Sequence, residues 1–224
     1  SAADAEAASA AGHRVVSRIE RSRVPIVAAI HGACLGAGLE MALACRYRIA
    51  TDHPKTVLGL PETQLGLIPG AGGTQRLRKV VGLQVALDMS LTAKNVRAKK
   101  ALQTGLVDTM VHPAILRSIA VQRAQALAAG TLRASRGKAP GFARKLLEGN
   151  AAGRAIVFRQ ARSMTLRKSR GAYPALLAAL DAVQAGFRGT AEQGFATEAR
   201  LFGEMAATAV SHELILLFVA TASL

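Results

Sequence analysis

Large aromatic side chains are scarce in this sequence. The 224 residues include no tryptophan, and phenylalanine and tyrosine together make up 4% of the chain. Half of the residues are nonetheless hydrophobic, so the core has to be built from Ala, Val, Leu, Ile and Gly. Such side chains suit closely packed helices and sheets. The length fits one large domain, or a domain with an extension.

Cysteine is also scarce. Cys34 and Cys45 are the two cysteines, too few for a disulfide framework or a cysteine-rich metal site. Both lie in apolar surroundings, which indicates packed thiols in a reducing compartment. Histidine offers no alternative, because no HExxH motif or metal-ligand spacing links the five histidines: His13, His31, His53, His112 and His212. We expect no metal.

Long apolar runs are missing. The first twelve residues, SAADAEAASAAG, contain acids and lack the apolar segment of a signal peptide. The most apolar stretch near the other end, 214–219, is far too short to span a bilayer. We therefore expect a cytoplasmic protein without a transmembrane segment.

Acidic residues are outnumbered. With 29 Lys and Arg against 14 Asp and Glu, the net charge is +15. Residues 131–170 hold 11 of these basic residues and a single acid, Glu148, a local balance of +10. Such a block can dock RNA, an anionic membrane or a partner subunit. A solvated basic helix face explains it better, because only Phe142 and Phe158 supply aromatic surface for stacking bases. We expect no nucleic acid partner and keep docking as the alternative.

The pattern of elements changes near residue 130. Apolar, β-branched runs predict strands at 24–30, buried and parallel, and at 47–51, 56–60 and 106–111. Helical patterns between them cover 13–23, 37–45, 73–82, 87–105 (one or two helices, ending at Gly105) and 113–130. Beyond 130 only helical patterns occur, with breaks at 136–141, 169–174 and 186–190. The last predicted helix starts with a capping box, Thr190 and Gln193. The sequence predicts an α/β core over 1–130 and a basic helical extension over 131–224.

Two glycine-rich turns each lead from a strand into a helix. Neither is a phosphate-binding loop: Gly32 is followed five residues later by Ala37, which fails the P-loop pattern. The dinucleotide pattern GxGxxG fails as well, because Met41 and Gln75 stand where its third glycine belongs. Taken singly, each glycine is best explained by close packing of helix on strand.

Each turn also has an acid beside it. Glu40 lies in the apolar helix after the first turn, and Glu62 follows a strand end. A helix start offers free N–H groups and a partial positive charge, which stabilise negative charge developing on a carbonyl oxygen. Carbonyl chemistry needs an acid and a base nearby, and burial raises the pKa of a carboxyl toward that use. Taken singly, Glu40 could be a solvent-facing acid at a helix start, and Glu62 an ordinary loop acid.

The motifs resemble one known family. PIVAAIHGACLGAGLEMALAC (25–45), GLPETQLGLIPGAGGTQRL (59–77) and the later LT…A…A…GLVD resemble the crotonase (enoyl-CoA hydratase/isomerase) family. RAIVFRQAR, RGAYPA and EARLFGEMA resemble the end of the hydratase part of multifunctional fatty acid oxidation α subunits. The resemblance covers roughly residues 13–224. It implies a partial ββα spiral followed by the helical extension.

The resemblance also implies roles for individual residues. Glu40 matches the glutamate that activates the attacking water, and Glu62 the one that delivers a proton to the α-carbon. Ala37 matches the peptide whose N–H forms half of the oxyanion hole, and Gly70 the glycine whose N–H holds the water. The substrate-pocket candidates are Gly36, Leu60 and Pro69.

The implied reaction is the hydration of trans-2-enoyl-CoA to 3-hydroxyacyl-CoA in β-oxidation, with Δ3-Δ2-enoyl-CoA isomerisation left open. Coenzyme A enters as part of the substrate, and no cofactor is implied. The implied partners are a thiolase β subunit and further copies of the chain.

The sequence departs from the family at several points. Ala37 and Ala93 stand where glycine is usual, and Arg46 where many members have aspartate. By analogy with the family, we expect that about 90–110 residues with the first ββα turns are absent here, together with the second oxyanion N–H, most coenzyme A contacts and the dehydrogenase domain. We therefore expect these 224 residues alone to have weak activity or none.

Overall fold

The computed structural model describes residues 1–133 and 147–222. Its helices are α1 (Ala2–Glu20), α2 (Ala37–Ala44), α3 (Gly73–Val81), α4 (Leu83–Thr92), α5 (Ala98–Thr104), α6 (Leu116–Ala128), α8 (Ala151–Ser169), α9 (Pro174–Ala185), α10 (Ala191–Ala206) and α11 (Ala209–Ala222), with 3₁₀ turns η1 (Glu62–Leu65) and η2 (Pro113–Ile115). Its strands are β1 (Val27–Ile30), β2 (Ala33–Leu35), β3 (Tyr47–Thr51), β4 (Val57–Gly59), β5 (Val96–Arg97) and β6 (Thr109–Val111).

The strands form two small sheets. One is all parallel, with the order β1-β3-β6, and the other has the order β2-β4-β5, with β2 parallel and β5 antiparallel to β4. The strand predicted at 47–51 is confirmed in full, whereas β4 and β6 occupy Val57–Gly59 and Thr109–Val111 of the runs predicted at 56–60 and 106–111. The run 24–30 pairs in parallel as predicted but is not fully buried, because β1 is an edge strand whose Ala29 is exposed.

Several elements escape the sequence patterns. β2 lies inside the predicted first turn and β5 between α4 and α5; with three and two residues, both are too short to show a period and form by pairing with β4. α1 begins at Ala2, well before the predicted start, and α11 follows the helix predicted to be last. The capping box of α10 and the helix stops at Gly82 and Gly105 are confirmed.

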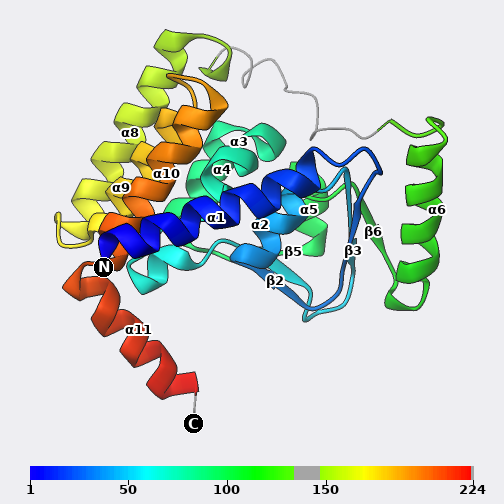
Figure 1. The fold of residues 1–224 in the computed structure, drawn as a ribbon, viewed down its shortest axis with the longest axis horizontal. Coiled ribbons are helices and arrows are strands. Elements are labelled where there is room, and N and C mark those ends of the chain that lie inside the picture. Colours follow the sequence, from blue (N-terminus) through cyan, green and yellow to red (C-terminus); the bar gives the residue numbers. More distant parts are fainter. Residues whose placement is uncertain (134–146, 223–224) are drawn as a thin grey trace.

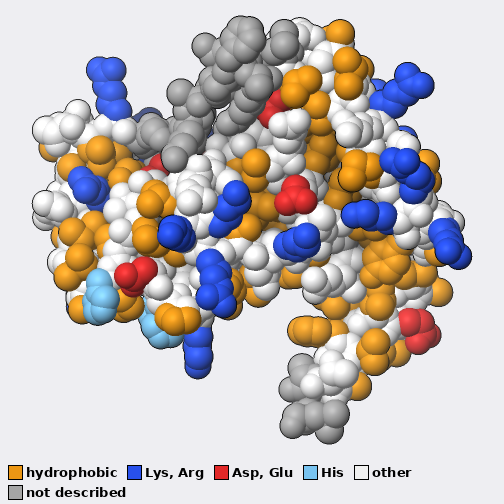
Figure 2. Space-filling view, turned by 180° about the vertical axis from the view of Figure 1, so that it is seen from behind, with side chains coloured by type: hydrophobic (Ala, Val, Ile, Leu, Met, Phe, Trp, Pro, Cys, Tyr) orange, Lys and Arg blue, Asp and Glu red, His pale blue; other side chains and the backbone are white. Residues whose placement is uncertain are grey.

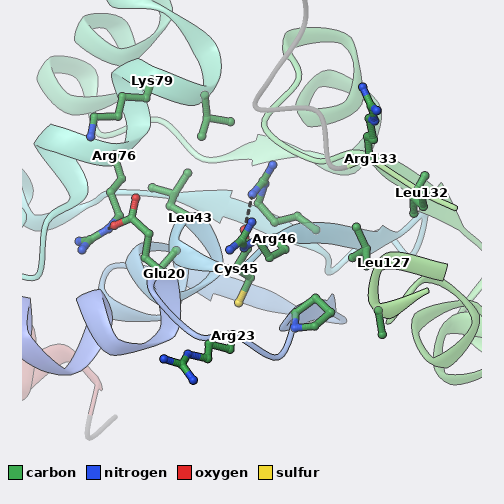
Figure 3. A pocket seen from close by; sticks show the side chains of 15 residues that line it. Glu20, Arg23, Leu43, Cys45, Arg46, Arg76, Lys79, Leu127, Leu132 and Arg133 are labelled. Atoms are coloured by element: carbon green, nitrogen blue, oxygen red, sulfur yellow. Dashed lines mark hydrogen bonds and ion pairs between the residues drawn. The ribbon is translucent and has the colours of Figure 1, made fainter. Parts of the chain in front are cut away.

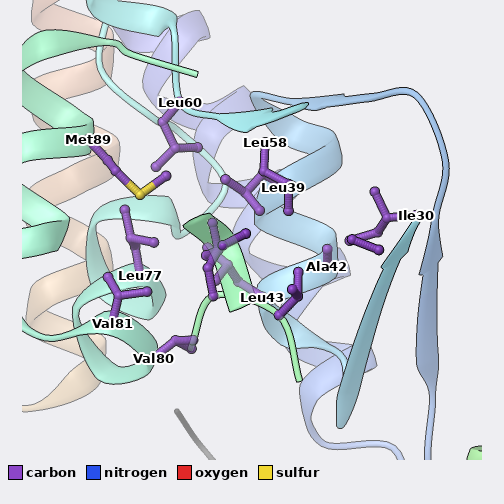
Figure 4. Close-up of a cluster of buried hydrophobic side chains, with 14 of the residues drawn as sticks. Ile30, Leu39, Ala42, Leu43, Leu58, Leu60, Leu77, Val80, Val81 and Met89 are labelled. Atoms are coloured by element: carbon purple, nitrogen blue, oxygen red, sulfur yellow. The ribbon is translucent and has the colours of Figure 1, made fainter. Parts of the chain in front are cut away.

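The main core lies between α2, α3, α4 and the β4 strand (Figure 4). Leu39 and Leu43 of α2, Leu77 of α3, Met89 of α4 and Leu58 of β4 belong to this one buried cluster. All five are at most 6% exposed. This core fixes α2 and α3, and with them the two glycine-rich turns that precede these helices.

A helical layer of α8, α9 and α10 covers α3 and α4 on one side of the molecule, and α1 crosses from α10 to α2 (Figure 1). Leu83 and Leu87 of α4 share a buried cluster with Phe158, Leu180 and Val183 of this layer. The predicted division at residue 130 stays a prediction. The predicted chain break at 136–141 lies outside the described residues, whereas those at 169–174 and 186–190 separate α8, α9 and α10 as expected.

The last helix, α11, projects from the body with apolar side chains on its surface (Figures 1 and 2). Leu216, Leu217, Phe218 and Val219 are 53–61% exposed. Among the described residues, no single helix has the length and hydropathy of a membrane span, although α10 and α11 meet that test as a pair separated by a 73° bend.

Candidate active site

The first glycine-rich turn leaves the start of α2 open. Gly36, with φ 55°, donates its N–H to Gly59 O at 3.0 Å and turns the chain from β2 into the helix. The first intrahelical bond runs from Glu40 N to Gly36 O at 3.0 Å. The N–H groups of Ala37 and Gly38 therefore precede the helical ladder, and neither has an acceptor among the described residues. Ala37 is exposed, so this partly positive helix end faces outward.

Glu40 lies on the buried face of α2. It is 2% exposed, whereas Met41 beside it is 45% exposed. Its Oε1 accepts the N–H of Ala71 at 2.8 Å and that of Gly73 at 2.6 Å. The first acid is thus buried and held by the second glycine-rich turn, and its interpretation as a solvent-facing acid is wrong.

Glu62 begins the 3₁₀ turn after β4 and points back toward the first turn. Its Oε1 lies 3.1 Å from the place that a Cβ on Gly36 would take. Its Oε2 is buried and has no hydrogen-bond partner among the described residues. An unpaired buried carboxyl oxygen beside the open helix start is not an ordinary loop acid.

The surroundings raise the pKa of both carboxyls. Burial, and then the charges of Glu198 and Glu62, raise the pKa of Glu40 to about 8, against the lowering effect of the Ala71 and Gly73 N–H groups. Burial and then the charge of Glu198 raise the pKa of Glu62 to about 7. The charge of Glu62 thus acts on Glu40, and the charge of Glu198 acts on both acids. Groups that titrate near neutral pH are suited to proton transfer.

The other predicted site residues lie around this pair. Gly70 accepts a hydrogen bond from Ser9 Oγ at 2.6 Å, and a Cβ there would lie 2.6 Å from the Phe202 ring, so glycine is required. Pro69 is buried against Gly73, and Leu60 is 0% exposed in the main core. The predicted roles of Gly70 in holding water and of Gly36, Leu60 and Pro69 in lining the substrate pocket stay predictions.

Two further residues of the site were not anticipated from the sequence. Glu198 of α10 is 0% exposed and accepts hydrogen bonds from Gly72 N at 2.6 Å and Thr74 N at 3.0 Å. His13 of α1 places its Nε2 2.7 Å from the same carboxylate. A signal was present: Glu198 falls on the apolar stripe of its helix, between Phe195 and Phe202, as Glu40 falls on the apolar face of α2.

A basic cavity of about 400 Å³ lies elsewhere, at the carboxyl end of α2 (Figure 3). Its lining includes one acid, Glu20, and six basic side chains: Arg23, Arg46, Arg48, Arg76, Lys79 and Arg133. Arg48 is paired with Asp108 at 3.0 Å and Arg76 with Glu20 at 3.0 Å. Neither catalytic candidate lines it. Within the described part of the chain, no three His, Cys, Asp or Glu side chains converge as a metal site.

Comparison with known proteins gives consistent matches. The family model described as enoyl-CoA hydratase/isomerase matches residues 2–162. The chain is 47% identical over 220 residues to a fatty acid oxidation complex subunit alpha of Shewanella amazonensis, covering 98% of this chain and 31% of that protein. The chain thus spans about a third of the length of this curated relative.

Solved structures agree. Pseudomonas aeruginosa DspI is 37% identical with a TM-score of 0.54, covering 57% of this chain and 51% of that chain. An enoyl-CoA hydratase from Bacillus anthracis is 26% identical with a TM-score of 0.52, covering 96% of this chain and 66% of that chain. The α/β crotonase-like fold with a helical C-terminal region, predicted from the motifs, is confirmed.

Proposed function

Because the chain belongs to the enoyl-CoA hydratase/isomerase family, we propose that it adds water to trans-2-enoyl-CoA to give 3-hydroxyacyl-CoA in fatty acid β-oxidation. One observation carries this proposal: Glu40, buried in the first turn of α2, and Glu62, which lies beside Gly36 with a buried Oε2 that has no partner among the described residues, stand at an open helix start. Coenzyme A is part of the substrate, and the step needs no cofactor.

The geometry suggests how the charges move. Glu40 takes a proton from the water whose oxygen bonds to C3, while Glu62 gives a proton to C2. The electrons of the C2=C3 bond pass through the thioester oxygen, where negative charge develops before C2 is protonated. The Ala37 N–H, at the start of α2, donates to that oxygen and stabilises it more in the transition state than in the substrate. Isomerisation of a Δ3 to a Δ2 double bond would use Glu62 as a proton shuttle between carbons.

The wider setting is also part of the proposal. The Shewanella relative is named as a subunit of a fatty acid oxidation complex. We infer that the present chain works within such an assembly in the cytoplasm, as an oligomer and with a thiolase β subunit as partner. The exposed apolar side chains of α11 are consistent with further protein contacts.

The alternative of a basic docking module gains no support. Phe158 is 4% exposed and packs edge-on against Phe187, with ring centroids 5.9 Å apart, so it cannot stack on a base. Arg162 is paired with Asp181. Phe142 and the basic residues at 136, 138, 144 and 145 lie outside the described residues.

An assay of 2-enoyl-CoA hydration tests the proposal. Glu40→Gln and Glu62→Gln should each lower kcat by about 10²- to 10⁴-fold, because each removes a positioned proton-transfer group. Glu204→Gln is the matched control: this acid lies on the surface and pairs with Arg200, so kcat should stay unchanged. Unchanged kcat in both site variants would refute the assignment.

A further inference from the structure

A third buried carboxylate, that of Glu198, is not used by the proposed reaction. Its Oε1 accepts the Gly72 N–H at 2.6 Å and lies 2.7 Å from His13 Nε2. Its Oε2 accepts the Thr74 N–H at 3.0 Å and also the Thr74 hydroxyl. With 0% exposure, this carboxylate can remain in the core only because so many donors surround it.

The second glycine-rich turn divides its N–H groups between two carboxylates. Ala71 and Gly73 donate to Glu40, whereas Gly72 and Thr74 donate to Glu198. These donors lie around the start of α3, which has no side-chain cap of its own. The orphan N–H groups of this helix start are therefore satisfied by acids from α2 and α10, on opposite sides of the turn.

We propose that Glu198, supported by His13, is a positioning residue that fixes this turn so that Ala71 and Gly73 aim their N–H groups at Glu40. This inference rests on the proposed function, in which Glu40 activates the water. Glu198 touches no reacting atom. Besides the effect of its charge on the pKa of Glu40, Glu198 acts through the turn, because adjacent N–H groups of one rigid backbone segment cannot be reoriented independently.

His13 completes the arrangement from α1. Its ring lies 5.1 Å from the Phe195 ring, centroid to centroid. The Arg76 guanidinium lies over the same Phe195 ring, 4.8 Å from its centroid. Arg76 also donates to Ala71 O at 2.9 Å. Contacts from α1, α3 and α10 thus hold the second turn. Both the helical layer and α1 therefore influence how the turn's N–H groups are oriented toward Glu40.

The test compares Glu198→Gln with a control that loses stability elsewhere. The glutamine keeps the shape but turns an NH₂ group toward a turn N–H, so at least one bond to the turn is lost. We expect kcat for 2-enoyl-CoA hydration to fall by about 10²-fold, as for a misplaced catalytic group, with KM changed less than about twofold. Leu180→Ala, in the cluster of α9 and α4, should lower Tm but leave kcat unchanged.

His13 provides a second variant, because it hydrogen-bonds to Glu198 and not to the turn. His13→Ala should lower kcat by a smaller factor than Glu198→Gln. His13→Gln, whose side-chain amide can donate a hydrogen bond from the position of Nε2, should retain most of the wild-type kcat. The inference is overturned if folded Glu198→Gln or His13→Ala keeps the wild-type kcat, or if Leu180→Ala loses as much kcat at an equal loss of Tm.

A measurement without substrate separates this inference from the proposed function. Amide hydrogen exchange at Ala71 and Gly73 should become about tenfold faster in Glu198→Gln and His13→Ala, since each N–H loses a fixed acceptor geometry. If the wild-type protein shows no hydration even within its fatty acid oxidation complex, but exchange increases in this way, the proposed function fails and the positioning role stands. If exchange at both amides is unchanged in both variants, the positioning role fails.

Discussion

The two glycine-rich turns look alike in sequence but differ in what their N–H groups do. Before α2, the N–H groups of Ala37 and Gly38 have no acceptor among the described residues. Before α3, four consecutive N–H groups, 71–74, are all taken by buried carboxylates. The same strand–turn–helix pattern therefore gives one open helix start and one fully occupied one.

The difference arises from the neighbours and not from the turns themselves. Acids reach the second turn from α2 and α10. Beside the first turn lies the Glu62 carboxyl, whose Oε2 has no partner among the described residues. An occupied helix start is a structural support, and an open one can bind negative charge on a ligand. Under the proposed function, the first turn is the binding element, and the second turn holds the catalytic group in place.

Among the contrasts between the two turns, the largest effect is expected from closing the open one. Ala37→Pro removes one N–H at the first position of α2, where proline fits the helix and Gly36 tolerates the conformation required before it. We expect kcat for 2-enoyl-CoA hydration to fall by about 10²- to 10³-fold, the usual loss for one oxyanion donor. Ala37→Gly keeps the N–H and should retain kcat. Full activity in the folded proline variant would show that the first turn does not hold the substrate oxygen.

The next contrast compares the loss of stability on substituting two glycines that have positive φ. Gly32 (φ 81°) has no atom within 4 Å of a new Cβ, whereas a Cβ on Gly72 (φ 100°) would overlap the Arg76 guanidinium. Gly32→Ala should cost about 1–2 kcal/mol of unfolding free energy, from backbone strain alone. Gly72→Ala adds overpacking and should cost about 1–3 kcal/mol more. Denaturant unfolding measures both, and equal losses would contradict the tight packing of the second turn.

The pH dependence of stability tests whether burial or the second turn governs Glu40. Its pKa of about 8 exceeds the ordinary 4.5, so the folded state binds more protons than the unfolded state between these values. The unfolding free energy of the wild type, minus that of Glu40→Gln, should therefore fall as pH rises from 5 to 8 and level off above. A difference that rises with pH would mean that the Ala71 and Gly73 N–H groups outweigh burial.

Sequence reasoning located this site well where the signal was local. An acid within an apolar helix pointed to a buried carboxyl, and Glu40 is buried. Glu198 carries the same signal, but its partners lie more than a hundred residues away, at 72 and 74, and no local pattern reveals such a pairing. β2 and β5 were missed for a similar reason, since their pairing with β4 creates them.

Ala93 is a strained departure from the family glycine, because it adopts φ 51° at the end of α4.

The smallest expected effect is on the unfolding free energy, at two glycines near the turns that have ordinary helical backbone. Gly38 of α2 has open space where a Cβ would lie, whereas a Cβ on Gly73 of α3 would lie 2.8 Å from both Glu40 Oε1 and Pro69 Cβ. Gly38→Ala should raise the unfolding free energy by up to about 1 kcal/mol, because alanine loses less entropy in a helix. Gly73→Ala should lower it despite the same gain in helix propensity. Measuring the Tm of both variants tests this prediction. If both substitutions raise Tm, the Glu40 carboxylate does not pack closely against Gly73 of the second turn.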